Sequence, residues 1–368
     1  MPDISKRGKS MPESPIRKLV PYAEKAKKEG IHVYHLNIGQ PDIESPNISI
    51  KAIKQIKRKI FEYSHSAGLE SYRKKISTYY NKLNLDVNYK DIIVTTGASE
   101  AILFAINSCL NNNDEIIIPE PFYANYNGFA NSCNAVIQPI KTNIQTGFKL
   151  PEIKEFENKI TKKTKAILIC NPNNPTGYLY NKKELETLKK IVRKHNLFLF
   201  VDEVYREFCY DKNKHYSILN FKDIKENVVV FDSVSKRYSM CGVRIGCLIS
   251  KNKKIINTAL KFAQARLSPP LLGQIASAAA IDVEKKYFNE IINTYEKRRN
   301  LLINELNKIP GIFCPLPKGA FYCIAELPVK NAEHFSKWIL NDFSYKKKTI
   351  MLAPASGFYS NNKLGLNQ

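Results

Sequence analysis

From about residue 90 onward, short apolar and β-branched runs alternate with amphipathic stretches. The apolar runs occupy residues 91–96, 114–120, 165–170, 197–205, 227–233 and 241–250, and residues 99–110 and 182–195 show a helical pattern of polar and apolar positions. Strands that alternate with helices predict a largely parallel sheet with helices on both faces. Ligands of such sheets bind beyond the carboxyl ends of the strands, so the polar segments after the strands are candidate sites.

The remaining pattern predicts a second, smaller unit. A helical pattern runs from about Leu272 to Lys308 and leads into a pattern of strands and turns at residues 311–328. The first forty residues contain several prolines and are typical of an arm that packs between the two units. A length of 368 residues agrees with two domains.

The chain is strongly basic, with 57 Lys and Arg against 34 Asp and Glu and a net charge of +23. A nucleic-acid partner is the first interpretation of such a charge. However, 46 of the basic residues are Lys and only 11 are Arg, and they are dispersed in pairs and triplets such as Lys162–Lys163 and Lys346–Lys348. Phosphate recognition favours Arg, which binds in a bidentate manner. We therefore expect a solvated basic surface and no nucleic-acid partner.

Hydropathy and cysteine content define the expected environment. No apolar run approaches the roughly 18 residues of a membrane span, and the first residues have no apolar signal segment. The eight cysteines are scattered without a CxxC pair. We expect a cytoplasmic protein that does not bind a membrane, with reduced thiols, no disulfides and no metal site.

Two polar segments that follow strands suit ligand binding. Residues Thr96–Ser99 join a strand to a helix, whose free N–H groups and positive dipole end suit a phosphate. Alone, this glycine turn is more typical of an ordinary strand-to-helix connection. Residues Asn171–Gly177 read NPNNPTG, and their two Asn-Pro steps stiffen the loop so that it can hold an Asn side chain in place. The alternative is a proline-rich turn.

Two further segments carry titratable groups. The run at 197–205 brings Asp202 and Tyr205 to the end of a strand, where the carboxylate can keep a heterocyclic nitrogen protonated. The alternative for Asp202 is a helix cap. Lys236 follows a strand and lies between apolar runs, near Ser233 and Arg244. Partial burial and nearby cations lower a lysine pKa and favour a Schiff-base nucleophile, whereas most other lysines of the chain belong to its surface.

These segments occur in the order found in a known family. Together with NIGQPD, YSHSAGLESYR, PEPFYANY, SVSKRYSMCGVRIG and KGAFY, they resemble the fold-type I enzymes that depend on pyridoxal 5′-phosphate, and among them the class I/II aminotransferases of the aspartate aminotransferase group. The resemblance covers essentially the whole chain. It implies an α/β fold with a mainly parallel seven-stranded sheet, helices on both faces, and a smaller α+β domain built from both chain ends. We expect an arm and part of the small domain in residues 1–45, a large cofactor-binding domain in 46–275 and an incomplete small domain in 276–368.

The resemblance also implies roles for the residues around the cofactor ring. Lys236 would form the Schiff base with pyridoxal phosphate and move the proton between the substrate and the cofactor. Asp202 would pair with the pyridinium nitrogen and keep the ring an electron sink. Tyr205 and Asn174 would donate hydrogen bonds to the ring oxygen, and Tyr123 would stack on the ring face.

Further residues are assigned to the phosphate and the substrate. The phosphate group would be held by Gly97, Ala98, Ser99, Ser233 and Arg244. Tyr63 would reach the phosphate of a neighbouring subunit, which implies a homodimer with shared active sites. Gly39 would lie beside the substrate carboxylate, and Asn174 would also face the substrate.

The chain departs from the family near its C-terminus. In the family an Arg that follows a turn there binds the substrate α-carboxylate, and this chain reads MLAPASGFYSNNKLGLNQ and stops where that Arg is expected. We expect either a truncated sequence or a protein with impaired transamination. Arg266 is a candidate to enter the partner's site and bind a dicarboxylate; the alternative is a surface or interface Arg.

The expected reaction is the transfer of the amino group of an L-amino acid, aspartate first, to a 2-oxo acid such as 2-oxoglutarate. One alternative is a β-lyase or another reaction on the same fold, because the motifs do not fix which substrate bond breaks. Another is a protein that binds the cofactor without turnover. A DNA-binding regulator of this fold would need a fused DNA-binding domain, for which the first forty residues leave no room.

Overall fold

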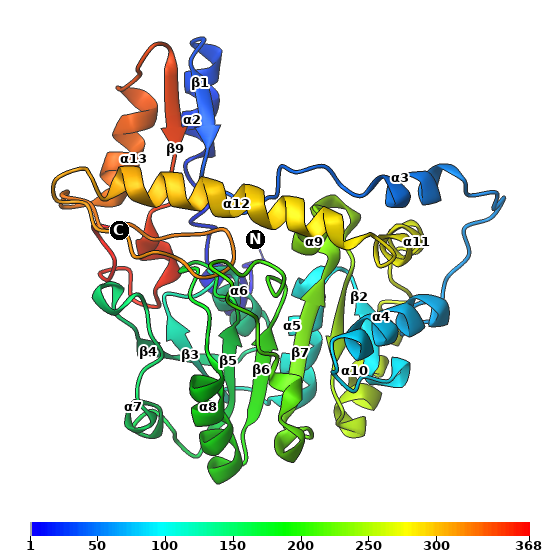
Figure 1. The fold of residues 1–368 in the computed structure, drawn as a ribbon. Coiled ribbons are helices and arrows are strands. Elements are labelled where there is room, and N and C mark those ends of the chain that lie inside the picture. The colour runs from blue at the N-terminus through cyan, green and yellow to red at the C-terminus, as the bar shows by residue number, and fades with distance from the viewer. Residues whose placement is uncertain (1) are drawn as a thin grey trace.

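The computed structural model describes residues 2–368 and shows a central seven-stranded sheet with the strand order β2-β8-β7-β6-β5-β3-β4 (Figure 1). The strands of this sheet are β2 (Ile92–Thr95), β3 (Glu115–Glu120), β4 (Val136–Lys141), β5 (Thr164–Cys170), β6 (Phe198–Asp202), β7 (Val228–Ser233) and β8 (Gly246–Ile249). All neighbours are parallel except β8, which runs antiparallel to both β2 and β7. The predicted mainly parallel seven-stranded sheet is confirmed.

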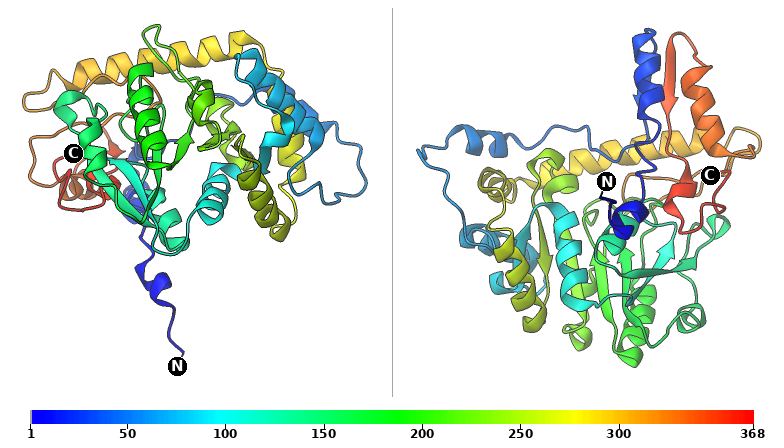
Figure 2. Two further views of the ribbon diagram at one scale, coloured as in Figure 1. Left: turned by 90° about the horizontal axis from the view of Figure 1, so that it is seen from below. Right: turned by 180° about the vertical axis from the view of Figure 1, so that it is seen from behind.

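Helices cover both faces of the sheet (Figures 1 and 2). The helices are α1 (Lys6–Ser10), α2 (Val20–Lys28), α3 (Asn47–Lys54), α4 (Glu70–Lys82), α5 (Gly97–Cys109), α6 (Asn125–Ser132), α7 (Ile153–Glu157), α8 (Lys182–His195), α9 (Val234–Arg237), α10 (Lys253–Ala265), α11 (Leu271–Ala280), α12 (Lys285–Leu306) and α13 (Ala332–Asn341). Alternate residues of β5 show the two layers: Ile167 and Ile169 pack with α4 and α8, and Ala166 and Leu168 pack with α5 and α10. This two-residue period buries both faces of the sheet.

Strand β4 is an element that the apolar pattern did not predict. It lies at the edge of the sheet and pairs only with β3. Its sequence contains Gln138 and Pro139, and only one of its six residues, Ile140, is fully buried. A proline is tolerated on an edge strand because one side of the strand has no partner to bond. The mixed composition that obscures β4 in the sequence therefore suits its position.

A separate two-stranded parallel sheet joins β1 (His32–His35) near the N-terminus to β9 (Lys348–Met351) near the C-terminus. Helices α2 and α13 pack beside it, and Leu19, Val33, Leu340 and Met351 share a small apolar core. Figure 1 shows this unit standing above the large sheet, with α12 running between them. Both chain ends thus build the smaller unit, while the exact domain boundaries remain a prediction.

The helical pattern predicted from about Leu272 to Lys308 forms two helices. The structure divides it into α11 and α12, and Glu284 between them has an extended backbone. Lys75 donates from Nζ to the carbonyl of Ala278 at 3.1 Å and pairs with Asp282, so the end of α11 has partners outside the helix. Seen from below, the segment that carries α1 extends away from the sheet (Figure 2, left). Among residues 2–368, no helix is both long enough and apolar enough to cross a membrane.

Candidate active site

The predicted polar segments meet at one edge of the large sheet. The carboxyl ends of β5, β6 and β7 point towards α12 (Figure 1), and these ends lead into Asn171–Gly177, Asp202 and Lys236. Strand β2 ends there too and leads into α5 at Gly97. The sheet therefore brings together segments that are up to 140 residues apart.

Lys236 lies on the short helix α9, directly after β7. Ser233 caps this helix, since its Oγ accepts a hydrogen bond from the backbone N–H of Ser235 at 3.0 Å. The Lys236 Nζ donates to the carbonyl oxygen of Gly39 and lies 5.9 Å from the centre of the Tyr205 ring. Burial lowers the pKa of Lys236, although the Cys241 thiol and the Asp202 carboxylate oppose this effect. A larger share of this amine is therefore neutral and nucleophilic than for an exposed lysine.

Asp202 is a buried carboxylate without a cationic partner among residues 2–368. Tyr126 donates from Oη to its Oδ2 at 2.9 Å, and the N–H of Val204 donates to its Oδ1 at 3.3 Å. Burial nevertheless raises the pKa of Asp202 to about 6. An unpaired buried carboxylate is unfavourable unless a cation compensates it, so this position suits a positively charged group of a ligand.

Three side chains form a hydrogen-bonded row beside Lys236. Asn174 donates from Nδ2 to the Tyr205 hydroxyl at 3.3 Å, and the hydroxyls of Tyr205 and Tyr322 are 2.7 Å apart. Tyr322 also packs closely on Gly39, where a Cβ atom would lie 1.8 Å from the Tyr322 Oη. Residue 39 must therefore be glycine for Tyr322 to occupy this place. The row fixes two phenol groups at a defined distance from the Lys236 amine.

The start of α5 forms a cradle for an anion. Gly97 has φ +72°, and a Cβ atom there would lie 2.4 Å from Nη2 of Arg244, so the guanidinium lies directly over the turn. The next N–H groups, those of Ala98 and Ser99, have no acceptor within the helix. The exposed Arg244 is held by a 3.0 Å hydrogen bond from Nη1 to the carbonyl of Cys241. Free N–H groups, a helix dipole and a guanidinium together suit a phosphate.

Ser233 and Tyr123 complete the group of residues that the structure brings together. The Ser233 hydroxyl donates to the carbonyl of Ile245 at 2.8 Å, at the side of the cradle. Tyr123 is partly buried, and its hydroxyl accepts a hydrogen bond from Asn125 Nδ2 at 2.7 Å. Burial and the Asp202 carboxylate raise the pKa of Tyr123, and the Arg244 guanidinium acts against them. The phenol therefore lies near both charged groups.

Two predicted residues lie apart from this group. Tyr63 is 75% exposed on the connection between α3 and α4, which runs along the outer side of the molecule (Figure 1). Arg266 directly follows α10 and donates from Nη2 to the carbonyls of Ser66 and Val94, at 3.3 and 3.2 Å. Its Nε lies 3.5 Å from Glu100 Oε1. Neither residue reaches Lys236 within one chain, so their roles at a partner's site stay predictions.

Sequence reasoning missed two residues of the site. Tyr126, the hydrogen-bond donor to Asp202, lies on α6, and Tyr322 lies in the loop that follows α12. Both are the last residues of segments already noted, PEPFYANY and KGAFY. A tyrosine at the end of such a segment was the available signal, but the contact itself depends on packing between distant parts of the chain.

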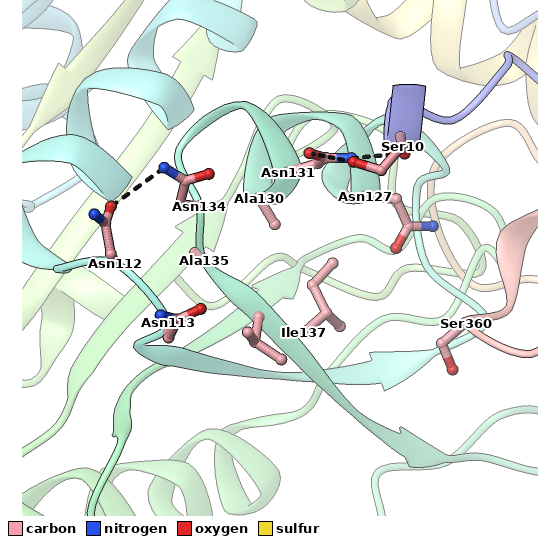
Figure 3. Close-up of a pocket in the computed structure, with 11 residues that line it drawn as sticks. Ser10, Asn112, Asn113, Asn127, Ala130, Asn131, Asn134, Ala135, Ile137 and Ser360 are labelled. Carbon is pink, nitrogen blue, oxygen red and sulfur yellow. Dashed lines mark hydrogen bonds between the residues drawn. The ribbon is translucent and has the colours of Figure 1, made fainter. Parts of the chain in front are cut away.

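A surface hollow lies away from the candidate active site, between α6, the β3–β4 edge and the N-terminal arm (Figure 3). Its volume is about 660 Å³. Five asparagines, Asn112, Asn113, Asn127, Asn131 and Asn134, make up much of its lining, and none of the lining residues is charged. Asn131 donates from Nδ2 to the carbonyl of Ser10 at 2.7 Å, so part of the wall ties the arm to α6. The hollow contains no titratable group, and we assign it no chemistry.

The α/β fold and the arrangement of Lys236, Asp202 and the Gly97 cradle define an enzyme of the aminotransferase class. The pattern of the family "Aminotransferase class I and II" matches residues 31–348, and the chain belongs to this family.

Individual relatives agree with this assignment. A putative aminotransferase of Bacillus subtilis, YugH, is 33% identical over 89% of this chain and 84% of its own length. An aspartate aminotransferase of Pyrococcus horikoshii is 31% identical over 96% of this chain and 89% of its own. The solved structure of an alanine aminotransferase from Pyrococcus furiosus, 32% identical, superposes with a TM-score of 0.89 over 97% of this chain and 92% of that one. The protein is therefore an aminotransferase.

Proposed function

We propose that this aminotransferase uses pyridoxal 5′-phosphate to move the amino group of an L-amino acid, with aspartate preferred, to a 2-oxo acid such as 2-oxoglutarate. The observation that carries the proposal is the buried Asp202 carboxylate, which lacks a cation, in the same site as the partly buried Lys236 amine. Aspartate is favoured because the relative from P. horikoshii is named for it, and the P. furiosus structure, named for alanine, supplies the main competitor.

The residues present fit the cofactor at three points. A pyridinium nitrogen would supply the cation that Asp202 lacks. The phosphate matches the cradle of Gly97, Ala98, Ser99 and Arg244, where the helix N-terminus offers N–H groups. The aldehyde matches the amine of Lys236. When bound, pyridoxal phosphate provides an electron sink for the charge that develops on the substrate carbon.

The side chains of the site have separate roles in the proposed reaction. Asp202 holds a proton on the ring nitrogen. Lys236, whose amine is more often neutral than that of a surface lysine, accepts and returns the proton of the substrate carbon. Asn174, which donates to the Tyr205 hydroxyl, and Tyr205 would both donate hydrogen bonds to the ring oxygen of the cofactor and so hold the ring in one orientation. Burial of this row excludes water from the reacting atoms.

We further propose a homodimer in which Tyr63 reaches the phosphate in the partner's site. Ile60 and Phe61, on the same connection, are 75% and 60% exposed, and exposed apolar residues that lie together are typical of an interface. We also propose that Arg266 enters the active site of the partner subunit and binds a dicarboxylate substrate there. Its ion pair with Glu100 gives it a second, structural role that Arg266→Ala would also disturb. A loss of aspartate activity that exceeds the loss of alanine activity separates the two roles.

We also propose a cytoplasmic location. All eight cysteines are free thiols, as expected for a reducing compartment. The partners are then a small amino acid and a 2-oxo acid.

The test is reconstitution of the purified protein with pyridoxal phosphate. We expect a visible absorbance band, a borohydride-stable adduct on the peptide that contains Lys236, and loss of the band when aspartate is added without a 2-oxo acid. Lys236→Ala should give no adduct, while Lys162→Ala, a change at a lysine outside the site, should behave as the wild type. A protein that retains no cofactor would refute the proposal. Release of pyruvate and ammonia without an acceptor would instead favour a β-lyase.

A further inference from the structure

A cluster of buried charges lies on the face of the sheet opposite to Asp202. Asp202 accepts a hydrogen bond from Tyr126, which packs in the layer of α5 and α10, whereas Asp232 Oδ2 accepts one from the Tyr80 hydroxyl of α4 at 2.8 Å. The reaction proposed above uses none of the charged side chains of this cluster. The cluster consists of carboxylates and guanidiniums, those of Glu203, Glu207, Asp232, Arg206 and Arg237.

The helix that carries Lys236 is too short to hold its own shape. Helix α9 contains only the four residues Val234–Arg237, and the N–H of Tyr238 donates to the carbonyl of Val234 at 3.2 Å. Isolated helices of fewer than about 12 residues are marginal in water. The position of the Lys236 amine therefore depends on the side chains that hold α9 in place.

Asp232 and Arg237 hold both ends of this helix. Asp232 Oδ1 accepts a hydrogen bond from the N–H of Ser233, the cap of α9, at 2.7 Å. Arg237, the last residue of α9, donates from Nη2 to both oxygens of Asp232, at 2.9 and 2.7 Å. Burial raises the pKa of Asp232, but the guanidiniums of Arg237 and Arg206 act against it and leave the pKa below its usual value. The pair is therefore ionised and spans the whole helix.

Arg237 also joins α9 to the segment that follows β6. Its Nε lies 2.8 Å from Oε1 of Glu207, which in turn accepts a hydrogen bond from the Tyr79 hydroxyl. Glu207 comes two residues after Tyr205, and the N–H of Phe208 donates to the carbonyl of Tyr205 at 2.9 Å, so the three residues form one turn. A single guanidinium thus connects α9 to the segment that carries Tyr205.

We propose that Arg237 is a positioning residue for the Lys236 amine. Its contacts with Asp232 and Glu207 fix α9 against the segment that carries Tyr205. The inference rests on the proposed function, in which Lys236 and Tyr205 act on the same cofactor. The Arg237 side chain packs against α4 on the other face of the sheet, so Arg237 acts through Lys236 and touches neither substrate nor cofactor. A displacement of about 1 Å between reacting groups costs on the order of 100-fold in rate.

The test replaces Arg237 by Lys and uses Arg206→Lys as the matched control. Lysine keeps the charge of the cluster, but its compact ammonium group does not reproduce the two separate contacts of the guanidinium fork. Arg206 is 5% exposed, like Arg237, but it pairs with Glu203 through Nη2 alone. Its Nε and Nη1 have no hydrogen-bond partner among residues 2–368. A lysine can therefore replace Arg206 but not Arg237.

The first measurement is hydrogen exchange of the cofactor-free protein, followed by mass spectrometry of a peptide that contains residues 234–238. In Arg237→Lys we expect the α9 amides to exchange at least about tenfold faster than in the wild type, because the helix opens more often. Arg206→Lys should exchange like the wild type in this peptide. This measurement needs no cofactor.

The second measurement compares two ligands. Pyridoxamine phosphate has no aldehyde and binds without reacting with Lys236, so its Kd should change by less than about threefold in Arg237→Lys. The rate at which pyridoxal phosphate forms the borohydride-stable adduct on Lys236 should fall by about 10- to 100-fold. The kcat should fall with it while KM stays within about threefold. A variant that is merely less stable would bind both ligands more weakly.

The outcomes separate this inference from the proposed function. A wild-type protein that forms no adduct contradicts the proposed function, and hydrogen exchange still tests the contacts of Arg237. Unchanged exchange of α9 in Arg237→Lys overturns the inference, as does an unchanged adduct rate or an equal effect of Arg206→Lys. If Arg237→Lys does not fold, Glu207→Gln weakens the same contact at its more exposed end. It should slow the adduct at least about threefold, and a wild-type rate in Glu207→Gln then overturns the inference.

Discussion

Replacing Asp202 by Asn should make the cofactor-free protein more stable near neutral pH while it removes activity. Asp202 is buried without a cationic partner among residues 2–368, and burial raises its pKa from 3.8 to about 6. A carboxyl group whose pKa is higher in the folded than in the unfolded protein stabilises the fold fully only at pH values below its unfolded pKa. This stabilisation is lost as the pH rises through the folded pKa of about 6. At neutral pH the ionised carboxylate therefore destabilises the cofactor-free fold.

The size of the effect follows from the two pKa values. Each pKa unit corresponds to about 1.4 kcal/mol, so the Asp202 carboxyl destabilises the cofactor-free fold by about 3 kcal/mol at pH 7.5 and by about 1 kcal/mol at pH 4.5. The stability difference between Asp202→Asn and the wild type should therefore grow by about 2 kcal/mol over this range. With an unfolding entropy of about 2.1 cal/mol/K per residue, a chain of 368 residues should show this as 2 to 3 °C in Tm. The hydrogen bonds from Tyr126 and Val204 favour the ionised carboxylate, and their effect is already contained in the pKa of about 6.

The assay is thermal unfolding of both cofactor-free proteins at one protein concentration and several pH values. Glu226→Gln removes the same charge from an exposed position and should follow the wild type at every pH. Tyr126→Phe removes a hydrogen bond that lowers the pKa of Asp202, so it should move the titration upward by about one pH unit. A constant difference in Tm between Asp202→Asn and the wild type from about pH 4.5 to 7.5 would refute the reasoning.

Three further predictions concern the close contacts of the site. Gly39→Ala should reduce kcat/KM at least about tenfold in a coupled transaminase assay, because its Cβ atom would lie 1.8 Å from the Tyr322 hydroxyl; unchanged kinetics would contradict the contact. Gly97→Ala should raise the Kd for pyridoxal phosphate about tenfold or more in a fluorescence titration, since φ is +72° and the Cβ atom would meet Arg244. The rate of covalent reaction of Lys236 with pyridoxal phosphate should rise with pH through a midpoint below the ordinary lysine value of 10.5, and stopped-flow absorbance at several pH values measures it.

The sequence predicted those parts of the fold that depend on local pattern. The buried strands β2, β3, β5, β6 and β7 were found because their apolar runs are short, continuous and separated by helical segments. Strand β4 was not predicted because it is an edge strand, and edge strands tolerate the polar residues and proline that interrupt its apolar pattern. The break between α11 and α12 was not predicted, because Lys75, which donates to the carbonyl of Ala278 near this break, lies about 200 residues away in the sequence.

The site shows the same division. Lys236, Asp202 and Gly97 were predicted because each ends or follows a strand in a distinctive local sequence. The contact of Tyr126 with Asp202 and that of Tyr322 with Gly39 arise from the packing of separate segments, which a local pattern does not specify. The proposed roles of Tyr63 and Arg266 depend on a second subunit, so the structure of a single chain does not test them.

The place of β8 in the sheet has a consequence for how the enzyme matures. Among the strands of residues 2–368, β2 pairs only with β8, and β8 in turn joins it to β7. The Gly97 cradle belongs to the β2 side and Lys236 to the β7 side, so the two come into register only after Gly246–Ile249 has been synthesised and inserted between them. A growing chain that has just left the ribosome up to Lys236 already carries the reactive amine but lacks the framework that aligns the phosphate with it. Under the proposed function, capture of pyridoxal phosphate would require β8 to be in place between β2 and β7, and the bound cofactor would then stabilise the finished fold over its incomplete predecessors.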